Sequence, residues 1–461
     1  MMYVPSIGYL VSTTLFIVGL KYLSIPSKAA KGNSVAAIGM VLAVAVTLLG
    51  FSMDDWHVNK AIILILAIGA GVFLGRSMSR RVEMTRMPQL ISLFNATGGA
   101  CAMLIGISET MNSTEEGLPP LMLSLIWLSV SIGAMSLTGS LVAIQKLSNK
   151  WKLKVGPRVR RLNRILPLLI TAIAVVALLG ISGYSTSMVT VMISLLALLY
   201  GVTFVWPIGG ADMPVVISLL NALTGVATAL TGVLFDNKIM IAGGIFVGAA
   251  GLILTLMMCK AMNRPLINVL LGAKNSSSTG SSASSEIVET SVAEVTTQMA
   301  FAQKVAIIPG YGLAVAQAQQ LCGQLQKSLL ARTTEVDFII HPVAGRMPGH
   351  MNVLLAEADI DYEHLYEMSD VNDQMNAYDM VLVVGANDVV NPAAERNEDS
   401  PIYGMPIIKA HEAKQVVVVK RSMNTGYAGI ENELFSEPNC KLLFGDAKLI
   451  LKDILTELKH L

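Results

Sequence analysis

The stretch KVAIIPGYGLAVA, residues 304–316, decides the fold of the C-terminal part of the chain. A β-branched run over 304–308 is followed by Gly310 and Gly312 and then by a stretch of helical composition. At such a junction, glycines let backbone amides and a helix N-terminus approach a pyrophosphate. Val315 stands where a third glycine would complete the pattern, so the motif alone is weak. Its position in the first β-α unit strengthens it.

The same alternation continues downstream of this junction. We expect strands at 304–308, 335–340, 379–384, 415–420 and 441–444, and helices near 313–331, 349–358 and 446–459. Strands separated by helices favour parallel pairing. Residues 301–461 are therefore predicted to form an α/β domain with a parallel sheet, whose strand ends meet glycine-rich turns at 345–350 and 385–388.

The residues that follow the strands indicate which nucleotide this sheet would bind. An NAD site usually has an acid at the end of the second strand to hold the ribose 2′-hydroxyl, but here that strand runs into His341. A later strand ends at Lys420-Arg421, followed by Ser422, and cations beside a hydroxyl suit a phosphate dianion. NADP is therefore favoured, with a solvated strand end as the alternative for the cationic pair.

Upstream of this region the composition is that of a membrane protein. The 461 residues are 53% hydrophobic and 14% charged, with a mean hydropathy of +0.60, whereas soluble proteins carry roughly a quarter charged residues. Residues 1–265 hold 19 Lys/Arg and 8 Asp/Glu, and residues 266–461 hold 14 and 24. The four cysteines lack C-x-x-C spacing, which argues against a disulfide framework, an iron–sulfur site or a structural zinc.

Nine apolar stretches are long enough to cross the membrane, which takes about 20 residues. They lie near 4–20, 32–53, 58–75, 87–108, 118–145, 165–183, 187–206, 213–235 and 239–259. The third is the weakest, because only 15 residues separate Lys60 from Arg76. The first has no basic n-region and no cleavage site, so we expect a retained span and not a signal peptide.

Charged residues in the loops predict the orientation of these spans. The loops after the first, third and fifth spans are basic, with eight Lys and Arg from Lys146 to Arg164, while the intervening loops carry acids. Because basic loops stay on the cytoplasmic side, the N-terminus is predicted outside and the C-terminal domain inside. Residues 266–300 connect the last span to the C-terminal domain. They include seven serines from Ser276 to Ser285, a composition typical of a flexible tether.

The interiors of the spans contain no Lys, Arg, Asp, Glu or His, so any transport must use uncharged polar groups. Two polar stripes follow helical spacing: Ser129, Ser136 and Ser140 in the fifth span, and Asn221, Thr224, Thr228 and Thr231 in the eighth. They are either interhelical hydrogen-bonding groups or a wetted proton path. Asn95 is a lone amide in the fourth span. Asp212, in the turn 209–214, either caps the next helix or faces ions or water.

These motifs resemble those of the β subunit of the proton-translocating NAD(P) transhydrogenases over nearly the whole chain. The segments that carry the resemblance are PGYGLAVAQAQ (309–319), HPVAGR (341–346), GANDVVNPAA (385–394), KRSMNTGYAG (420–429) and GGADMP (209–214). The resemblance implies a nine-helix membrane domain over 1–265, a linker over 266–300 and a Rossmann-like NADP(H) domain over 301–461. It also implies Si/Re-specific hydride transfer from NADH on a separate α subunit to NADP⁺ on this chain, coupled to inward proton movement.

The resemblance further implies the residues of the cofactor site. At the glycine junction and the phosphates they are Gly310, Tyr311, Gly312, Val315, Val343, Ala344, Gly345, Arg346, Met347 and Pro348. By the nicotinamide they are Gly385, Ala386, Asn387 and Asp388, and at the 2′-phosphate Lys420, Arg421 and Ser422. The lid and the closing loops add Gly404, Met405, Met423, Gly426, Tyr427, Gly445 and Asp446.

The sequence departs from the family's pattern at one residue that would take part in proton coupling. Asp388 is expected to link protonation to NADP(H) binding, and Asp212, Asn221 and Ser140 match the family's proton path. Asn95 stands where some members have a histidine, and an amide does not titrate near neutral pH, so water or a group on the α subunit would replace it.

The resemblance implies an α subunit with its own membrane helices, a dimer of αβ units in the cell inner membrane, no metal and no nucleic acid. Hydride transfer needs no general acid or base from the protein, which fits the lack of a nucleophile motif. The alternative is a multi-span transporter or channel gated by a nucleotide-sensing domain.

Overall fold

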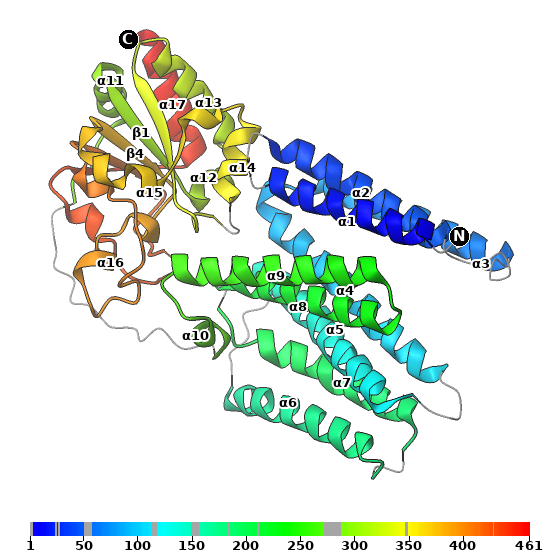
Figure 1. Cartoon of the computed structure of the whole chain (residues 1–461). Coiled ribbons are helices and arrows are strands. Elements are labelled where there is room, and N and C mark those ends of the chain that lie inside the picture. The colour runs from blue at the N-terminus through cyan, green and yellow to red at the C-terminus, as the bar shows by residue number, and fades with distance from the viewer. Residues whose placement is uncertain are drawn as a thin grey trace. The chain divides into compact units, whose positions relative to one another are not determined.

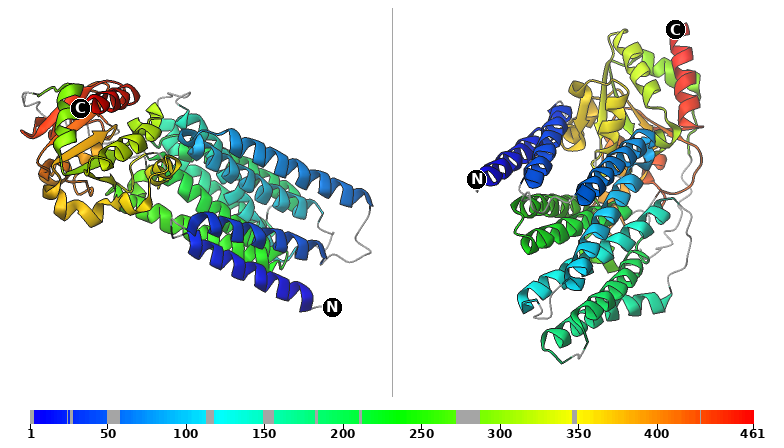
Figure 2. Two further views of the ribbon diagram at one scale, coloured as in Figure 1. Left: turned by 90° about the horizontal axis from the view of Figure 1, so that it is seen from above. Right: turned by 90° about the vertical axis from the view of Figure 1, so that its right-hand side faces the viewer.

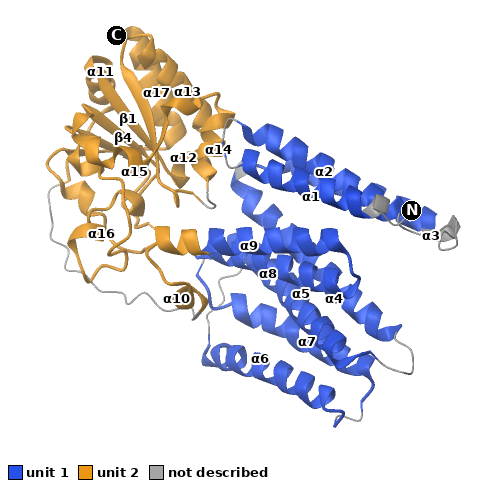
Figure 3. Ribbon diagram, viewed as in Figure 1, with its two compact units in different colours: residues 1–255 blue, residues 256–461 orange. Residues whose placement is uncertain are grey.

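The structure is a computed structural model, and it divides the chain into two compact units, residues 1–255 and 256–461 (Figure 3). It describes residues 3–23, 25, 28–49, 58–112, 118–148, 156–181, 184–209, 212–271, 287–345, 349–426 and 428–461. Some charged residues of the predicted loops lie outside the described residues: the acids at 54, 55, 115 and 116 and the bases at 150, 152 and 154.

The first unit is built from long apolar helices (Figure 1). They are α1 (Tyr3–Leu23), α2 (Ala29–Leu49), α3 (Val58–Arg81), α4 (Met87–Met111), α5 (Pro120–Leu147), α6 (Pro157–Leu178), α7 (Thr186–Val205), α8 (Met213–Leu234) and α9 (Lys238–Ala261), with η3 (Met84–Arg86) ahead of α4. The residues of α9 from 256 onward belong to the second unit. In the described part of the chain, nine helices have the length and composition of a membrane span, which confirms the prediction. Figure 2 shows the helices of this unit running roughly alongside one another.

Two of these helices extend further into charged sequence than we predicted. Helix α3 continues through Arg76 to Arg81, and α6 begins at Pro157, so that four arginines expected in the preceding loop lie in its first turns. Arginine is a good helix former, and its long side chain can reach the headgroup region from the end of a span. The helix therefore extends beyond the apolar stretch at both places, after it in α3 and before it in α6.

Helices α4, α5 and α8 pack closely against one another. Where α4 meets α5, a Cβ atom on Gly99 would lie 2.5 Å from the Gly133 carbonyl oxygen, and one on Gly133 would lie 2.7 Å from that of Gly99. Small residues at such crossings let helix backbones approach each other. These two glycines therefore set the distance between α4 and α5.

The second unit contains a six-stranded parallel sheet in the order β3-β2-β1-β4-β5-β6. The strands are β1 (Lys304–Pro309), β2 (Glu335–Ile340), β3 (Leu365–Glu367), β4 (Met380–Val384), β5 (Val416–Lys420) and β6 (Cys440–Phe444). The predicted α/β fold with a parallel sheet is confirmed, and β1 and β4 are buried almost throughout. The three-residue edge strand β3 was not predicted.

Helices and short 3₁₀ turns connect the strands and cover the sheet. They are α12 (Tyr311–Ala316), α13 (Gln319–Leu330), α14 (His350–Glu357), η4 (Tyr362–His364), α15 (Met368–Val371), η5 (Asn372–Ala377), η6 (Asp388–Val390), α16 (Ala393–Arg396), η7 (Ala410–Glu412), η8 (Glu433–Ser436) and α17 (Ala447–His460). The single helix expected near 313–331 is divided, because Gln317 adopts a left-handed conformation (φ 51°) after α12.

The predicted tether contains ordered pieces at both ends. Helix α10 covers Leu266–Leu271, and α11 (Val292–Phe301) packs on α17. Just before α11, Leu442 of β6 donates its N–H to the Val288 carbonyl (2.8 Å), and Thr290 donates to the Leu442 carbonyl (3.0 Å). The serine-rich part, 272–286, lies outside the described residues.

Candidate functional site

Three glycines pack backbone to backbone where β1 and β4 end. The Gly310 N–H donates to the Val384 carbonyl and the Gly312 N–H to the Gly385 carbonyl, each at 2.9 Å. A Cβ atom on any of the three would lie closer than 3.0 Å to the opposing backbone. The loop after β1 and the loop after β4 can therefore approach this closely only with glycine at these positions.

This glycine junction lies at the point where the strand order reverses, because β1 has β2 on one side and β4 on the other. Open α/β sheets bind ligands outside the carboxyl ends of their strands at this point. Val315 is 41% exposed on α12. Since the third glycine of the dinucleotide motif serves close helix–strand packing, an exposed Val315 explains why the pattern lacks it.

A buried histidine fixes the turn that follows β2. His341 is 1% exposed, its Nδ1 accepts the Val343 N–H (3.2 Å), and its Nε2–H donates to the Pro406 carbonyl (2.7 Å). The turn is thereby tied to the residue that follows the predicted lid residues Gly404 and Met405. Gly345 follows with φ +107°, packed against the His350 ring. The predicted phosphate-binding residues at 346, 347 and 348 lie outside the described residues.

The environment of His341 makes the stability of this domain depend on pH. Burial lowers the pKa of His341 to about 4, against a smaller opposing effect of its hydrogen bond to Pro406. The unfolded chain binds a proton near pH 6.5, so the contribution is full above that pH and is lost as the pH falls toward 4. We expect the contribution of His341 to the free energy of unfolding to fall by about 3 kcal/mol over this pH range.

The measurement is thermal unfolding of the full chain at steps from pH 7 to pH 5. His341→Gln should flatten the slope of unfolding free energy against pH, and the exposed His460→Gln should leave it unchanged. A wild-type slope that persists in His341→Gln would assign the pH dependence to other groups.

The loop after β4 is held against the loop that precedes η8. Asp388 Oδ2 accepts the Ala428 N–H (2.9 Å), and Asn432 Nδ2 donates to the Asn387 carbonyl (2.9 Å). Gly426 also packs against the Asp388 carboxylate, leaving no room for a Cβ atom. Sequence reasoning missed Asn432, because an asparagine outside any motif gives no signal of a contact 45 residues away.

Lys420 is the last residue of β5, at the same carboxyl end of the sheet. Its ammonium lies over the Phe435 ring, 4.2 Å from the centroid, and donates to the Asn424 carbonyl (3.3 Å). Burial lowers the pKa of Lys420, and the Asp388 carboxylate partly offsets this. Arg421, Ser422 and Met423 are exposed, and the predicted tyrosine at 427 lies outside the described residues.

The predicted lid and closing loops lie partly in the core. Gly404 has φ +74° and donates to the Ala394 carbonyl (2.8 Å), while Met405 is buried with Ala394, Ile402 and Ile407. Gly445 donates to the Lys420 carbonyl (2.8 Å), and Asp446 caps α17 by accepting the Lys448 N–H (3.0 Å). Gly445 thus joins the ends of β5 and β6.

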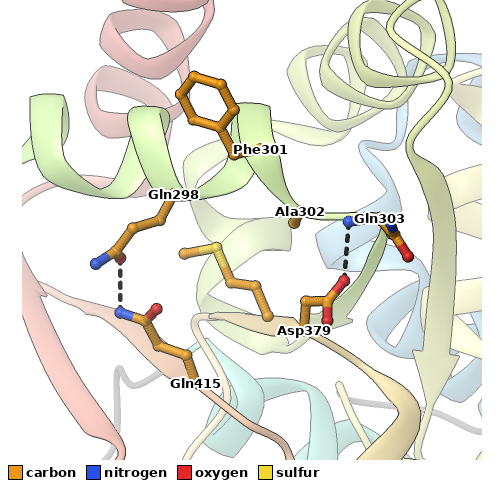
Figure 4. A pocket seen from close by; sticks show the side chains of 7 residues that line it. Gln298, Phe301, Ala302, Gln303, Asp379 and Gln415 are labelled. Carbon is orange, nitrogen blue, oxygen red and sulfur yellow. Dashed lines mark hydrogen bonds between the residues drawn. The ribbon is translucent and has the colours of Figure 1, made fainter.

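A surface hollow of about 500 Å³ lies at the opposite end of the strands (Figure 4). It is lined by residues that precede β1, β4 and β5: Gln303, Asp379 and Gln415, together with Gln298, Phe301, Ala302 and Met380. Two of its side-chain amides pair with each other, since Gln415 donates to Gln298 (2.6 Å). Because nucleotides bind at the carboxyl ends of such strands, this hollow is not the candidate site.

In the first unit, the two predicted polar stripes face each other between α5 and α8. Ser136 hydrogen-bonds Thr224 (2.5 Å), and Ser129 hydrogen-bonds Thr231 (3.0 Å). The structure therefore contains the interhelical hydrogen bonds of the first interpretation. Asn221 is half-buried, and none of the hydrogen bonds found in the described residues involves its side chain.

Asn95 and Ser140 lie at the same packing region of the first unit. Asn95 is 5% exposed and donates to the Ile217 carbonyl of α8 (3.2 Å). The Ser140 hydroxyl is fully buried without a hydrogen-bond partner in the described part of the chain, while its carbonyl accepts from Ser92 (3.0 Å). These contacts bring two of the predicted path residues to the interface of α4, α5 and α8.

Asp212 directly precedes α8 and is 8% exposed. Its carboxylate makes no capping hydrogen bond to this helix. The turn before it is held by a residue that sequence reasoning used only for topology. Lys146 Nζ donates to the carbonyls of Trp206 and Ile208, both at 2.5 Å. Residues 210 and 211 of the predicted turn lie outside the described residues.

The chain is similar to known proteins over nearly its whole length. The family described as NAD(P) transhydrogenase beta subunit matches residues 5–457. Two matching proteins from Rhodospirillum rubrum, one of them assigned to a specific strain, are each named NAD(P) transhydrogenase subunit beta. Each is 40% identical over 459 residues, covering 97% of this chain and 97% of its own length.

Proposed function

Because this chain belongs to the NAD(P) transhydrogenase beta subunit family, we propose that it binds NADP(H) and accepts hydride from NADH held on an α subunit. In the proposal the reaction is Si/Re-specific, needs the α subunit, and is coupled to proton movement into the cell. The family's name implies the α partner and the use of both nucleotides. The transporter alternative has no comparable support.

One observation carries the proposal, namely the close packing of Gly310, Gly312 and Gly385 where β1 and β4 diverge. Glycine at each of them lets the two loops meet backbone to backbone, which brings the N-terminus of α12 to the strand ends where a pyrophosphate would bind. Lys420 ends the next strand of the same sheet. Its half-buried ammonium fits the extra phosphate of NADP better than the 2′-hydroxyl of NAD.

The role of the protein in this reaction is binding and orientation. When bound, the nicotinamide supplies the hydride chemistry. Tyr311 and the turn 343–348 would hold the phosphates, Ala386 to Asp388 would lie by the nicotinamide, and Arg421 and Ser422 would join Lys420 at the 2′-phosphate. The segment 392–406 would act as a lid.

Coupling would act through the relative affinities for NADP⁺ and NADPH. Asp388 is the proposed link, since its carboxylate receives the Ala428 N–H of the loop that follows the Lys420 motif. In the membrane, Asp212, Asn221, Ser140 and Asn95 are the proposed path residues. The chain would lie in the cell inner membrane, with its N-terminus on the outer side and its NADP(H) domain in the cytoplasm. It would assemble with the α subunit as a dimer of αβ units.

The test is calorimetric binding of NADP⁺, NADPH and NAD⁺ to the full chain, before and after Lys420→Ala/Arg421→Ala. Charge-assisted hydrogen bonds contribute about 1.5–3 kcal/mol each. Losing two of them should weaken NADP(H) binding roughly a hundredfold or more. The matched control is Lys452→Ala/Lys459→Ala, two exposed lysines of α17, which should bind like wild type.

Two results would contradict the proposal. One is equal affinity of the wild-type chain for NADP(H) and NAD⁺. The other is an NADP(H) preference that survives in Lys420→Ala/Arg421→Ala. Either would return the nucleotide-gated transporter to consideration.

A further inference from the structure

Phe435 is a buried aromatic residue with one polar neighbour of functional interest. Its side chain is 5% exposed and belongs to the core cluster that includes Val418, Leu434 and Leu442. The Lys420 ammonium lies over its ring at 4.2 Å from the centroid. No motif in the sequence singled out Phe435.

The ring is held in place from two directions. Phe435 lies in η8, whose first turn is fixed by Asn432: its Oδ1 accepts the Leu434 N–H (2.9 Å) and its Nδ2 donates to Asn387. Phe435 also belongs to a buried core cluster that contains residues of β5 and β6. Phe435 is therefore a fixed surface, whereas the lysine above it has a long, flexible side chain.

A fixed ring face changes what Lys420 can do. The quadrupole of an aromatic ring attracts an ammonium, and the attraction grows as the pair is removed from water. Lysine loses considerable rotamer freedom when it is held in one position, so a lysine already positioned binds an anion at lower entropic cost. The Asn424 carbonyl accepts one of the three ammonium protons, which leaves donors for a phosphate.

We propose that Phe435 is the positioning residue for NADP specificity, because its ring holds the Lys420 ammonium where the 2′-phosphate binds. This inference rests on the proposed function and adds to it a residue that touches no cofactor. Phe435 acts only through Lys420. Its effect should therefore be confined to ligands that carry the 2′-phosphate.

The experiment measures dissociation constants of NADPH and NADH for the full chain. Phe435→Leu should weaken NADPH binding about fivefold to tenfold and leave NADH binding unchanged, while Phe435→Tyr, which keeps the ring, should bind NADPH like wild type. The matched control is Leu434→Val, which removes a methylene from the neighbouring buried residue. Thermal unfolding of each variant establishes that the comparison is made on folded protein.

A double-mutant cycle separates positioning from packing. In the Lys420→Ala background, Phe435→Leu should cause no further loss of NADPH affinity. Equal weakening of NADPH and NADH, or an additional loss in that background, would overturn the inference while leaving the NADP(H) site intact. A wild-type chain without NADP(H) preference would instead overturn the proposed function itself.

Discussion

Replacing Gly385 with alanine is expected to destabilise the C-terminal domain by about 2–5 kcal/mol and to abolish NADP(H) binding. Gly385 has φ +69°, a conformation that costs other residues roughly 1–2 kcal/mol. Its added Cβ atom would also lie closer than 3.0 Å to the backbone of Gly312, and overpacking of this kind costs about 1–3 kcal/mol more. Since whole domains are stable by about 5–15 kcal/mol, this is a large fraction.

Gly429 provides the control for this prediction. It also has a left-handed φ, +72°, but a Cβ atom there would meet nothing within 4 Å. Gly429→Ala should therefore show only the conformational cost. Chemical denaturation and NADPH binding of both variants measure the difference, and equal effects would mean that the close approach of the two loops has no energetic consequence.

Gly99→Val is expected to have the largest effect in the membrane domain. Its side chain would collide with the backbone of α5 at Gly133, and neither backbone can move without opening the α4–α5 interface. Separation of these helices would also carry Asn95 away from its Ile217 acceptor on α8. We expect loss of folded protein in detergent. Under the proposed function, any protein that remains folded should transfer hydride without translocating protons.

The matched variant is Gly69→Val in α3. The substitution is the same and lies in another span, but a Cβ atom at Gly69 would meet nothing within 4 Å. Thermal stability in detergent and proton uptake by vesicles reconstituted with the α subunit would compare the two. Similar losses in both variants would show that the cost comes from the helix and not from the contact with Gly133.

The sequence allowed the type of most elements to be predicted, because their patterns are strong. The apolar stretches need no neighbours to be recognised, and the buried strands β1 and β5 consist almost entirely of β-branched or apolar residues. Strand β3 was missed because its three residues, two of them exposed, carry no periodicity. The break between α12 and α13 depends on the left-handed Gln317, a residue that seldom signals a helix end.

The candidate site was predictable where it depends on short motifs. Gly310 and Gly385 follow strands directly, Gly312 lies two residues after Gly310, and the structure brings the three together. By contrast, Phe435 and Asn432 act through contacts with residues distant in sequence, and a single sequence carries no trace of such pairs. Lys146 was read as a loop charge, although its ammonium binds two carbonyls at the end of α7.

The pairing of residues 288–290 with β6 has a consequence for self-association. An exposed sheet edge is a template for pairing with another chain, and proteins protect such edges by covering them or by keeping the edge strand short. Here Val288 and Thr290 occupy the Leu442 backbone groups at one edge, and β3 at the other edge has only three residues. A fragment of this domain cut at residue 301 would uncover β6 and invite edge-to-edge aggregation, so any excised domain should begin before Ile287.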